Sequence, residues 1–200
     1  LLFNDAGFGI AVGGTSGKST VTGMIAWILH EGDYDPTVMN GAVMKNFVTP
    51  ANPFASAQIG RPDLFVSEVD ESDGSIALYR PTVGVLLNVS LDHKSIEELR
   101  VLFGNFVASA GTAVINCDSP EAGYLVPNAR ERVTFGIRSR DADITVEPDS
   151  IDQSEFGIRA AVIDNRKREV FPLILPMPGL HNLSNALAAI AAASAAGIGV

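Results

Sequence analysis

A glycine-rich segment near the amino terminus limits the possible folds of this chain more than any other feature. Apolar residues from Phe8 to Val12 predict a short strand, and Ser19 to His30 predicts a helix with one apolar face. Glycines let the backbone N–H groups of an intervening turn converge, and a helix that starts there adds a partial positive charge. The pattern predicts an anion-binding loop, with sequence Gly13-Gly14-Thr15-Ser16-Gly17-Lys18-Ser19-Thr20.

This loop carries the strongest ligand prediction in the sequence. Lys18 would contact the β- and γ-phosphates of a nucleotide, and the Ser19 hydroxyl would bind Mg²⁺. Val12 stands where the commonest form of the motif has its first glycine, so the loop follows a shorter variant. The alternative is a turn that caps a helix and binds no ligand. We expect the phosphates of ATP to be bound by Gly14, Thr15, Ser16, Gly17, Lys18, Ser19 and Thr20.

The next hundred residues alternate between strand-like and helix-like segments. Apolar runs at 64–66, 83–87 and 113–115 predict strands that are covered on both faces, and 96–110 predicts an amphipathic helix. Alternation of this kind is typical of an α/β fold. We therefore expect a P-loop domain whose mostly parallel sheet is flanked by helices.

A different pattern occupies the region near 141–176. Short alternating runs appear there, with Asp164 and Asn165 forming a turn between two of them. A small-residue helix at about 180–196 follows. These runs predict a small antiparallel β excursion before the chain returns to helix.

Acidic residues and one histidine follow two of the expected strands. The strand at 64–66 runs into Glu68-Val69-Asp70-Glu71-Ser72-Asp73, and the strand at 83–87 is followed by Asp92-His93. In open α/β sheets the carboxyl ends of the strands line the ligand crevice, where acids can hold Mg²⁺. We expect Glu68 and His93 to lie on neighbouring strand ends and to share a metal site. The alternatives are a solvated acidic loop and a surface histidine.

Composition narrows the classes of partner and compartment. The chain has 200 residues, enough for one domain with a core, and its net charge of −9 argues against nucleic acid as a partner. No stretch approaches the roughly 20 apolar residues of a spanning helix, so no membrane insertion is expected. A single cysteine excludes a disulfide framework and fits the cytoplasm. The chain starts without Met, which suggests a fragment of a longer protein.

Several motifs, in order along the chain, resemble those of the Mur ligase family. Val12 to Thr20 is similar to its GT-x-GK-[TS]-T loop, and Val38 to Gly41 resembles its V-N-G segment. Its E-A-D-E-S-D run is matched by Glu68 to Asp73. Its two remaining motifs, N-I-x-x-D-H and P-G-x-H-N-x-x-N-A, are matched by Asn88-Val89 with Asp92-His93 and by Pro178 to Ala186. The similarity favours members that act on UDP-N-acetylmuramate or recycle murein peptides.

The resemblance implies a domain organisation and a reaction. Residues 1–200 would form a single Mur ligase central, ATP-binding domain, with the UDP-sugar domain before it and the carboxy-terminal domain after it both absent from this chain. The whole enzyme would be an ATP-dependent amide-forming ligase that works through an acyl phosphate. It would join an amino acid or peptide amine to a UDP-N-acetylmuramate-type carboxylate in peptidoglycan synthesis or recycling, with ATP and Mg²⁺.

The same resemblance implies roles for individual residues. Lys18, Glu68 and His93 would be catalytic: Lys18 at the ATP phosphates, Ser19 and Glu68 at one Mg²⁺ and His93 at a second. The adenine would lie at the start of the last helix, although these residues could also simply cap it; they are His181, Asn182 and Asn185. Further residues of the substrate site, or supports of its ligands, would be Asn40, Glu71 and Asp92.

Three other functions compete with this interpretation. A ligase for another carboxylate, such as one making a cyanophycin-like polymer, would share the loop and the Asp-His pair. A non-catalytic nucleotide-binding module would need no second metal ligand, so Lys18, Glu68 and His93 together argue against it. A P-loop kinase for a small alcohol would not need the His-Asn-x-x-Asn helix start.

Overall fold

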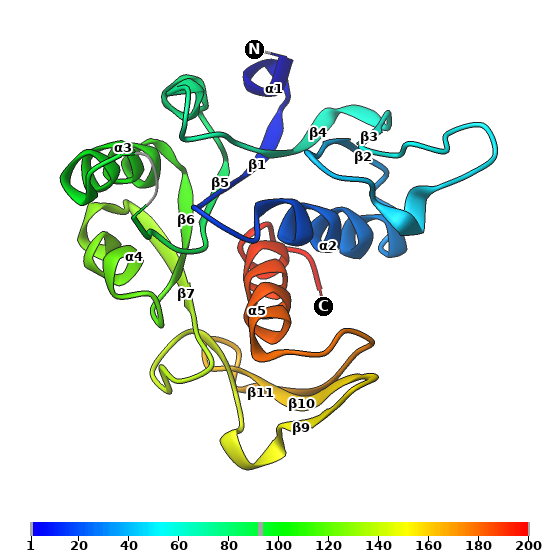
Figure 1. Ribbon diagram of the computed structural model, residues 1–200, viewed down its shortest axis with the longest axis vertical. Coiled ribbons are helices and arrows are strands. Elements are labelled where there is room, and N and C mark those ends of the chain that lie inside the picture. Colours follow the sequence, from blue (N-terminus) through cyan, green and yellow to red (C-terminus); the bar gives the residue numbers. More distant parts are fainter. Residues whose placement is uncertain (1, 92–93, 200) are drawn as a thin grey trace.

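A single large sheet organises the molecule (Figure 1). The computed structural model describes residues 2–91 and 94–199. Its helices are α1 (Leu2–Asp5), α2 (Lys18–Glu31), α3 (Ile96–Ser109), α4 (Pro120–Tyr124) and α5 (Leu180–Ala195). Its strands are β1 (Phe8–Gly13), β2 (Pro36–Met39), β3 (Ala57–Gln58), β4 (Arg61–Glu68), β5 (Val83–Leu86), β6 (Thr112–Asn116), β7 (Glu131–Phe135), β8 (Ile144–Val146), β9 (Asp152–Ser154), β10 (Gly157–Asp164) and β11 (Glu169–Leu175).

The central strands of the sheet are parallel. They lie in the order β2-β4-β1-β5-β6-β7-β8, and each neighbouring pair in that series is parallel. Five of the six residues of β1 and all four of β5 are buried, as expected for strands covered on both faces. Val12 pairs with Glu68 and Gly13 with Leu86, so β1, β4 and β5 end at the same edge. The expected α/β fold is confirmed.

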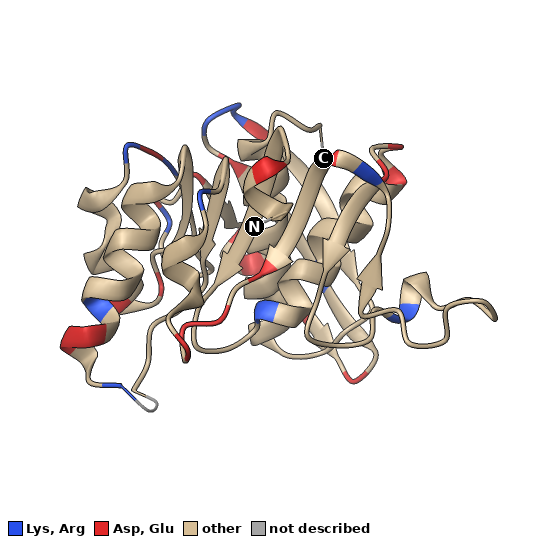
Figure 2. Ribbon diagram, turned by 90° about the horizontal axis from the view of Figure 1, so that it is seen from above, with Lys and Arg blue, Asp and Glu red and all other residues tan. Residues whose placement is uncertain are grey.

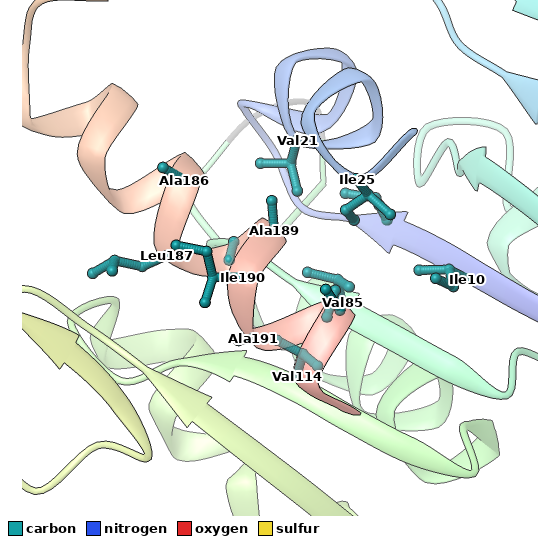
Figure 3. Packing of buried hydrophobic residues seen from close by; sticks show 14 of the residues in the cluster. Ile10, Val21, Ile25, Val85, Val114, Ala186, Leu187, Ala189, Ile190 and Ala191 are labelled. Atoms are coloured by element: carbon teal, nitrogen blue, oxygen red, sulfur yellow. The ribbon is translucent and has the colours of Figure 1, made fainter. Parts of the chain in front are cut away.

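Helices cover both faces of this sheet. Helices α2 and α5 pack on one face, and α3 and α4 pack on the other. Figure 3 shows Val21 and Ile25 of α2 gathered with Ala189 of α5 over the strand residues Ile10 and Val85. The buried side chains of α5 are mostly alanine, which lets this helix lie close to the strands and to α2.

The antiparallel region extends the same sheet. Strand β10 pairs antiparallel with β8, β9 and β11, so the expected excursion near 141–176 is present and continues the parallel strands through β8. The hairpin between β10 and β11 turns just after Asp164, whose Oδ1 accepts hydrogen bonds from the N–H groups of Arg166 and Lys167 at 3.0 Å each.

Charged residues are dispersed over the molecule. Figure 2 shows Lys and Arg on loops and near the ends of helices and strands, interleaved with Asp and Glu. Among the helices of the described residues, none has both the length and the apolar character needed to cross a membrane.

Candidate functional site

The glycine-rich loop connects β1 to α2 and needs its glycines for two reasons. Gly14 and Gly17 have φ values of 138° and 87°, a region that side chains with a Cβ rarely adopt. Space is also short: a Cβ on Gly14 would lie 3.1 Å from Leu87 Cβ, and one on Gly17 would lie 2.9 Å from Asn185 Oδ1. The loop is therefore held between the end of β5 and the first turns of α5.

The loop presents free backbone donors at the start of α2. The first bond of the helix runs from the N–H of Val21 to the carbonyl of Gly17 at 3.0 Å. The preceding N–H groups, those of Gly17 to Thr20, have no hydrogen-bond partner among the described residues. Unpaired N–H groups at a helix start, together with the helix dipole, form a site that fits phosphate.

Lys18 is bound to the protein itself in this structure. Its Nζ donates to the carbonyl of Gly14 at 2.8 Å and to Glu71 Oε2 at 2.9 Å. The Lys18 side chain is 19% exposed and that of Glu71 is 9% exposed, so this ion pair is largely shielded from water. The acidic loop after β4 thus places one carboxylate directly on the expected phosphate-binding cation.

Ser19 and Glu68 form a second contact beside the first. Ser19 Oγ donates to Glu68 Oε2 at 2.6 Å, and Asn40 Nδ2 donates to the carbonyl of Ser19 at 3.0 Å. A Cβ on Gly41 would collide with Glu68 Oε1, so glycine at that position leaves the room that the carboxylate occupies. Ser19 and Glu68, expected at one metal ion, are therefore brought together, and Asn40, expected in the substrate site or as a support for its ligands, lies beside them.

These oxygens fit a magnesium ion that keeps most of its ligands as water or phosphate. Mg²⁺ prefers oxygen and is usually held in proteins by one or two carboxylates. Ser19 Oγ and Glu68 Oε2 already lie within hydrogen-bond distance of each other at the mouth of the loop. Within residues 2–91 and 94–199 no three His, Cys, Asp or Glu side chains form a metal cluster. The pairing of a hydroxyl with a carboxylate oxygen therefore suits Mg²⁺ brought in with a phosphate ligand.

Asn88, just beyond β5, holds the tip of the loop. Its Oδ1 accepts from Thr15 Oγ1 at 2.7 Å and from the N–H of Ser16 at 2.9 Å, while its Nδ2 donates to the carbonyl of Ser16 at 2.9 Å. Its own carbonyl accepts from the N–H of Thr15 at 3.2 Å. Asn88 had no predicted role, although it opens one of the motifs that resemble those of the family. Because Thr15 and Ser16 use their N–H groups here, the free donors are those of Gly17 to Thr20.

The remaining acids of the loop after β4, Asp70 and Asp73, accept hydrogen bonds from within that loop. Hydrogen bonds from the N–H and hydroxyl of Ser72 lower the pKa of Asp70, and those from Ser75 do the same for Asp73. Of the acids in this run, Glu68 and Glu71 are the ones that contact the glycine-rich loop and its helix.

The three residues expected to contact adenine at the start of α5 make different contacts. Asn182 Nδ2 donates back to the carbonyl of Pro178 at 2.7 Å, and the His181 ring lies against Gly179. Asn185 instead faces Gly17 of the phosphate loop. The residue before the helix, Gly179, offers no side-chain cap. Neither asparagine caps a free N–H group in this structure, and their contact with adenine stays a prediction.

The expected second metal ligand falls outside the described residues. This ligand is His93, and both His93 and the preceding Asp92 lie between the described ranges 2–91 and 94–199. The expectation that Glu68 and His93 follow neighbouring strands is wrong, because β1 lies between β4 and β5 and pairs with both. The metal role of His93 stays a prediction.

A cavity opens beside the phosphate loop. Its volume is about 790 Å³, within the range of small-molecule sites. Ser19 and Thr20 are among the residues that line it, together with the apolar side chains of Met24 and Trp27 from α2 and of Phe47 from the segment after β2. A ligand bound at the start of α2 would therefore have adjoining space.

Comparison with known proteins agrees with the motifs. Residues 12–193 match the Mur ligase middle domain. UDP-N-acetylmuramate–L-alanine ligase of Rhizorhabdus wittichii is 37% identical over 197 residues, which cover 92% of this chain and 40% of that protein. The protein of the same name from Aquifex aeolicus is 37% identical over 202 residues, covering 95% and 41%.

Solved structures give the same result. UDP-N-acetylmuramate-alanine ligase MurC from Thermotoga maritima superposes with a TM-score of 0.79 at 29% identity, over 95% of this chain and 42% of that one. A murein peptide ligase from Psychrobacter arcticus gives 0.78 at 28% identity, over 96% and 44%. The chain spans about 40% of the length of the curated relatives it matches. Both kinds of comparison confirm the resemblance, and this chain belongs to the Mur ligase family, whose middle domain it contains.

Proposed function

We propose that this chain binds ATP with Mg²⁺ at the glycine-rich loop and forms the nucleotide-binding part of an ATP-dependent carboxylate–amine ligase. The observation that carries the proposal is the placement of Lys18 and Ser19 at the start of α2, directly opposite Glu71 and Glu68. A cation, a hydroxyl and free N–H groups at one helix start, with the Glu68 carboxylate beside the hydroxyl, supply what phosphoryl transfer requires of a protein.

Each residue at the loop has a role in this proposal. The N–H groups of Gly17 to Thr20 and the ammonium of Lys18 bind the phosphates and offset the negative charge that develops during transfer. Ser19 Oγ and Glu68 would hold Mg²⁺, which would supply positive charge to neutralise the phosphates. The substrate carboxylate attacks the γ-phosphorus and ADP leaves, forming an acyl phosphate. An amine then displaces phosphate to form the amide. His93 as a second metal ligand, and Asp92 beside it, belong to the same proposal.

The proposed substrates follow from the relatives. Those relatives are ligases of UDP-N-acetylmuramate with L-alanine, or of murein peptides. We extend that substrate class to the whole protein: a UDP-N-acetylmuramate-type carboxylate and an amino acid or peptide amine, in the cytoplasm, for peptidoglycan synthesis or recycling. Residues 1–200 would act there as one middle domain, flanked by the parts that the relatives have beyond it. Adenine recognition by His181, Asn182 and Asn185 is part of this proposal.

Titration of the chain with ATP and Mg²⁺ by calorimetry tests the binding step. We expect saturable binding that Lys18→Ala abolishes or weakens by about a hundredfold, because a buried charge-assisted contact is lost. The melting temperature should fall, because the variant leaves the buried Glu71 carboxylate without its partner, so far-UV circular dichroism must establish that the variant is folded at the temperature of the titration. Lys167→Ala in the exposed turn after β10 is the matched control and should bind as the unaltered chain does. Equal affinity in the Lys18 and Lys167 variants would contradict the proposal.

A further inference from the structure

The partner of Lys18 has a property that the proposed function does not require. Glu71 is buried, with 7% of its surface exposed, and it contacts Lys18 with no other hydrogen-bond partner among the described residues. A phosphate group bound at the loop would compete for the same ammonium. Glu71 would then be a buried carboxylate without its partner, close to an anion of like charge.

Resting on the proposed function, we infer that Glu71 makes nucleotide binding depend on a divalent cation. In this structure Glu71 neutralises Lys18. When phosphate takes Lys18, the freed carboxylate needs another positive charge, and a divalent cation carried by the nucleotide provides it. Free nucleotide brings no such charge, so it meets the full repulsion of Glu71.

The neighbouring acids do not fit this role. Asp70 and Asp73 accept hydrogen bonds from Ser72 and Ser75 within their own loop, and a phosphate at Lys18 would not compete for those donors. Glu68 contacts a neutral hydroxyl, so it holds no cation that a phosphate would remove. Glu71 is the acid of this run whose partner is the phosphate-binding lysine.

The test measures the dissociation constant of ADP by calorimetry with Mg²⁺ and with EDTA. In the unaltered chain we expect EDTA to weaken binding strongly. In Glu71→Gln the Mg²⁺-free affinity should rise by about tenfold or more, because one negative charge next to the phosphates is removed. The ratio between the two conditions should fall accordingly. Glu71→Asp keeps the charge and should keep the Mg²⁺ dependence.

Glu121→Gln is the matched control. Glu121 forms a similarly short ion pair, with Arg100 at 2.6 Å, but on α4. Its loss should leave both dissociation constants unchanged. Far-UV circular dichroism and a melting curve establish that each variant is folded, and Glu71→Ala replaces Glu71→Gln if the latter is not.

The possible outcomes distinguish a failure of the inference about Glu71 from a failure of the proposed function. If Mg²⁺-free affinity does not rise in Glu71→Gln, the inference is wrong, including the case in which only the Mg²⁺-bound affinity falls and Glu71 is a simple metal ligand. If the unaltered chain binds no nucleotide in either condition, the proposed function is wrong and the inference falls with it.

Discussion

Three side chains at the phosphate loop make hydrogen bonds to other protein atoms, and these contacts have different consequences. Lys18 and Ser19 contact carboxylates that a ligand or metal would displace or share. Asn88 instead bonds the loop backbone at Ser16, away from the free donors, so a phosphate bound at those donors would not compete for the same atoms. The contacts of Lys18 and Ser19 therefore bear on ligand binding, whereas those of Asn88 fix the conformation of the loop.

Replacing Asn88 should therefore weaken binding by letting the loop move. Asn88→Ala removes bonds to Thr15 and Ser16, each worth about 1 kcal/mol, so we expect the affinity for Mg²⁺ with ADP to fall about tenfold or more. The measurement is calorimetry, with a melting curve. Asn165→Ala is the control, since Asn165 also bonds a backbone carbonyl, that of Ala142 at 2.7 Å, in the antiparallel region. A loss of affinity that is the same in both variants would contradict this role.

At the scale of elements, one carboxylate connects the segment after β6 to the loop between β7 and β8. Asp118, after β6, accepts hydrogen bonds from the N–H groups of Ile137, Arg138 and Ser139, which lie between β7 and β8. Burial acts to raise its pKa, but these hydrogen bonds and the one from Ser139 Oγ outweigh burial and hold the pKa below its usual value of 3.8. The folded state is therefore favoured by the ionised form of Asp118.

The stability of the fold should depend on that ionisation. A folded-state pKa below the unfolded value gives stability that is present above about pH 4 and is lost as the pH falls through the folded-state pKa. We expect Asp118→Asn to lower the free energy of unfolding at pH 7 by about 1–2 kcal/mol, allowing for partial solvent exposure.

Denaturant unfolding at pH 7 and pH 3 measures the effect. The difference between Asp118→Asn and the unaltered chain should shrink at the lower pH. Asp63→Asn, at an exposed ion pair with Arg61, is the control and should change stability little. If the two variants behave alike at pH 7, the hydrogen bonds of Asp118 do not stabilise the fold as described.

The elements that the sequence predicts well are those with long apolar runs. Strands β1, β4 and β5 and helices α2, α3 and α5 lie where period and burial predicted them. The short segments β3, β9 and α4 were not predicted, because two to five residues of mixed polarity carry no periodic signal. The order of the strands in the sheet could not be predicted from the sequence either. Strand β1 lies between β4 and β5, and this order depends on tertiary pairing alone.

The site shows the same division. Lys18, Ser19 and Glu68 could be predicted because a loop motif and a strand end fix their places. Which acid of the run 68–73 meets Lys18 could not, since that depends on turns at Ser72 and Ser75. Position along the chain also hid Asn88, which is 72 residues from the Ser16 it supports.

At the scale of the whole molecule, the phosphate loop is connected to the sheet and to the two helices, α2 and α5, that cover one of its faces. Asn88 joins it to β5, Asn185 faces it from α5, and α2 begins within it. Helices α2 and α5 pack together in the larger core, which also includes side chains from β1, β5, β6, β7 and β8. A ligand that fixes the loop should therefore stabilise the fold as a unit rather than the loop alone.

This coupling predicts a thermal shift. A ligand that binds only the folded state at ten times its dissociation constant adds about 1.4 kcal/mol, which corresponds to a rise of about 3–6 °C for a chain of this size. We expect Mg²⁺ with ADP to raise the melting temperature by that amount, with one cooperative transition followed by both circular dichroism and Trp27 fluorescence. Lys18→Ala should show no rise, while Lys167→Ala should show all of it. Two separate transitions, with only one moved by the ligand, would mean that the loop and the sheet unfold independently.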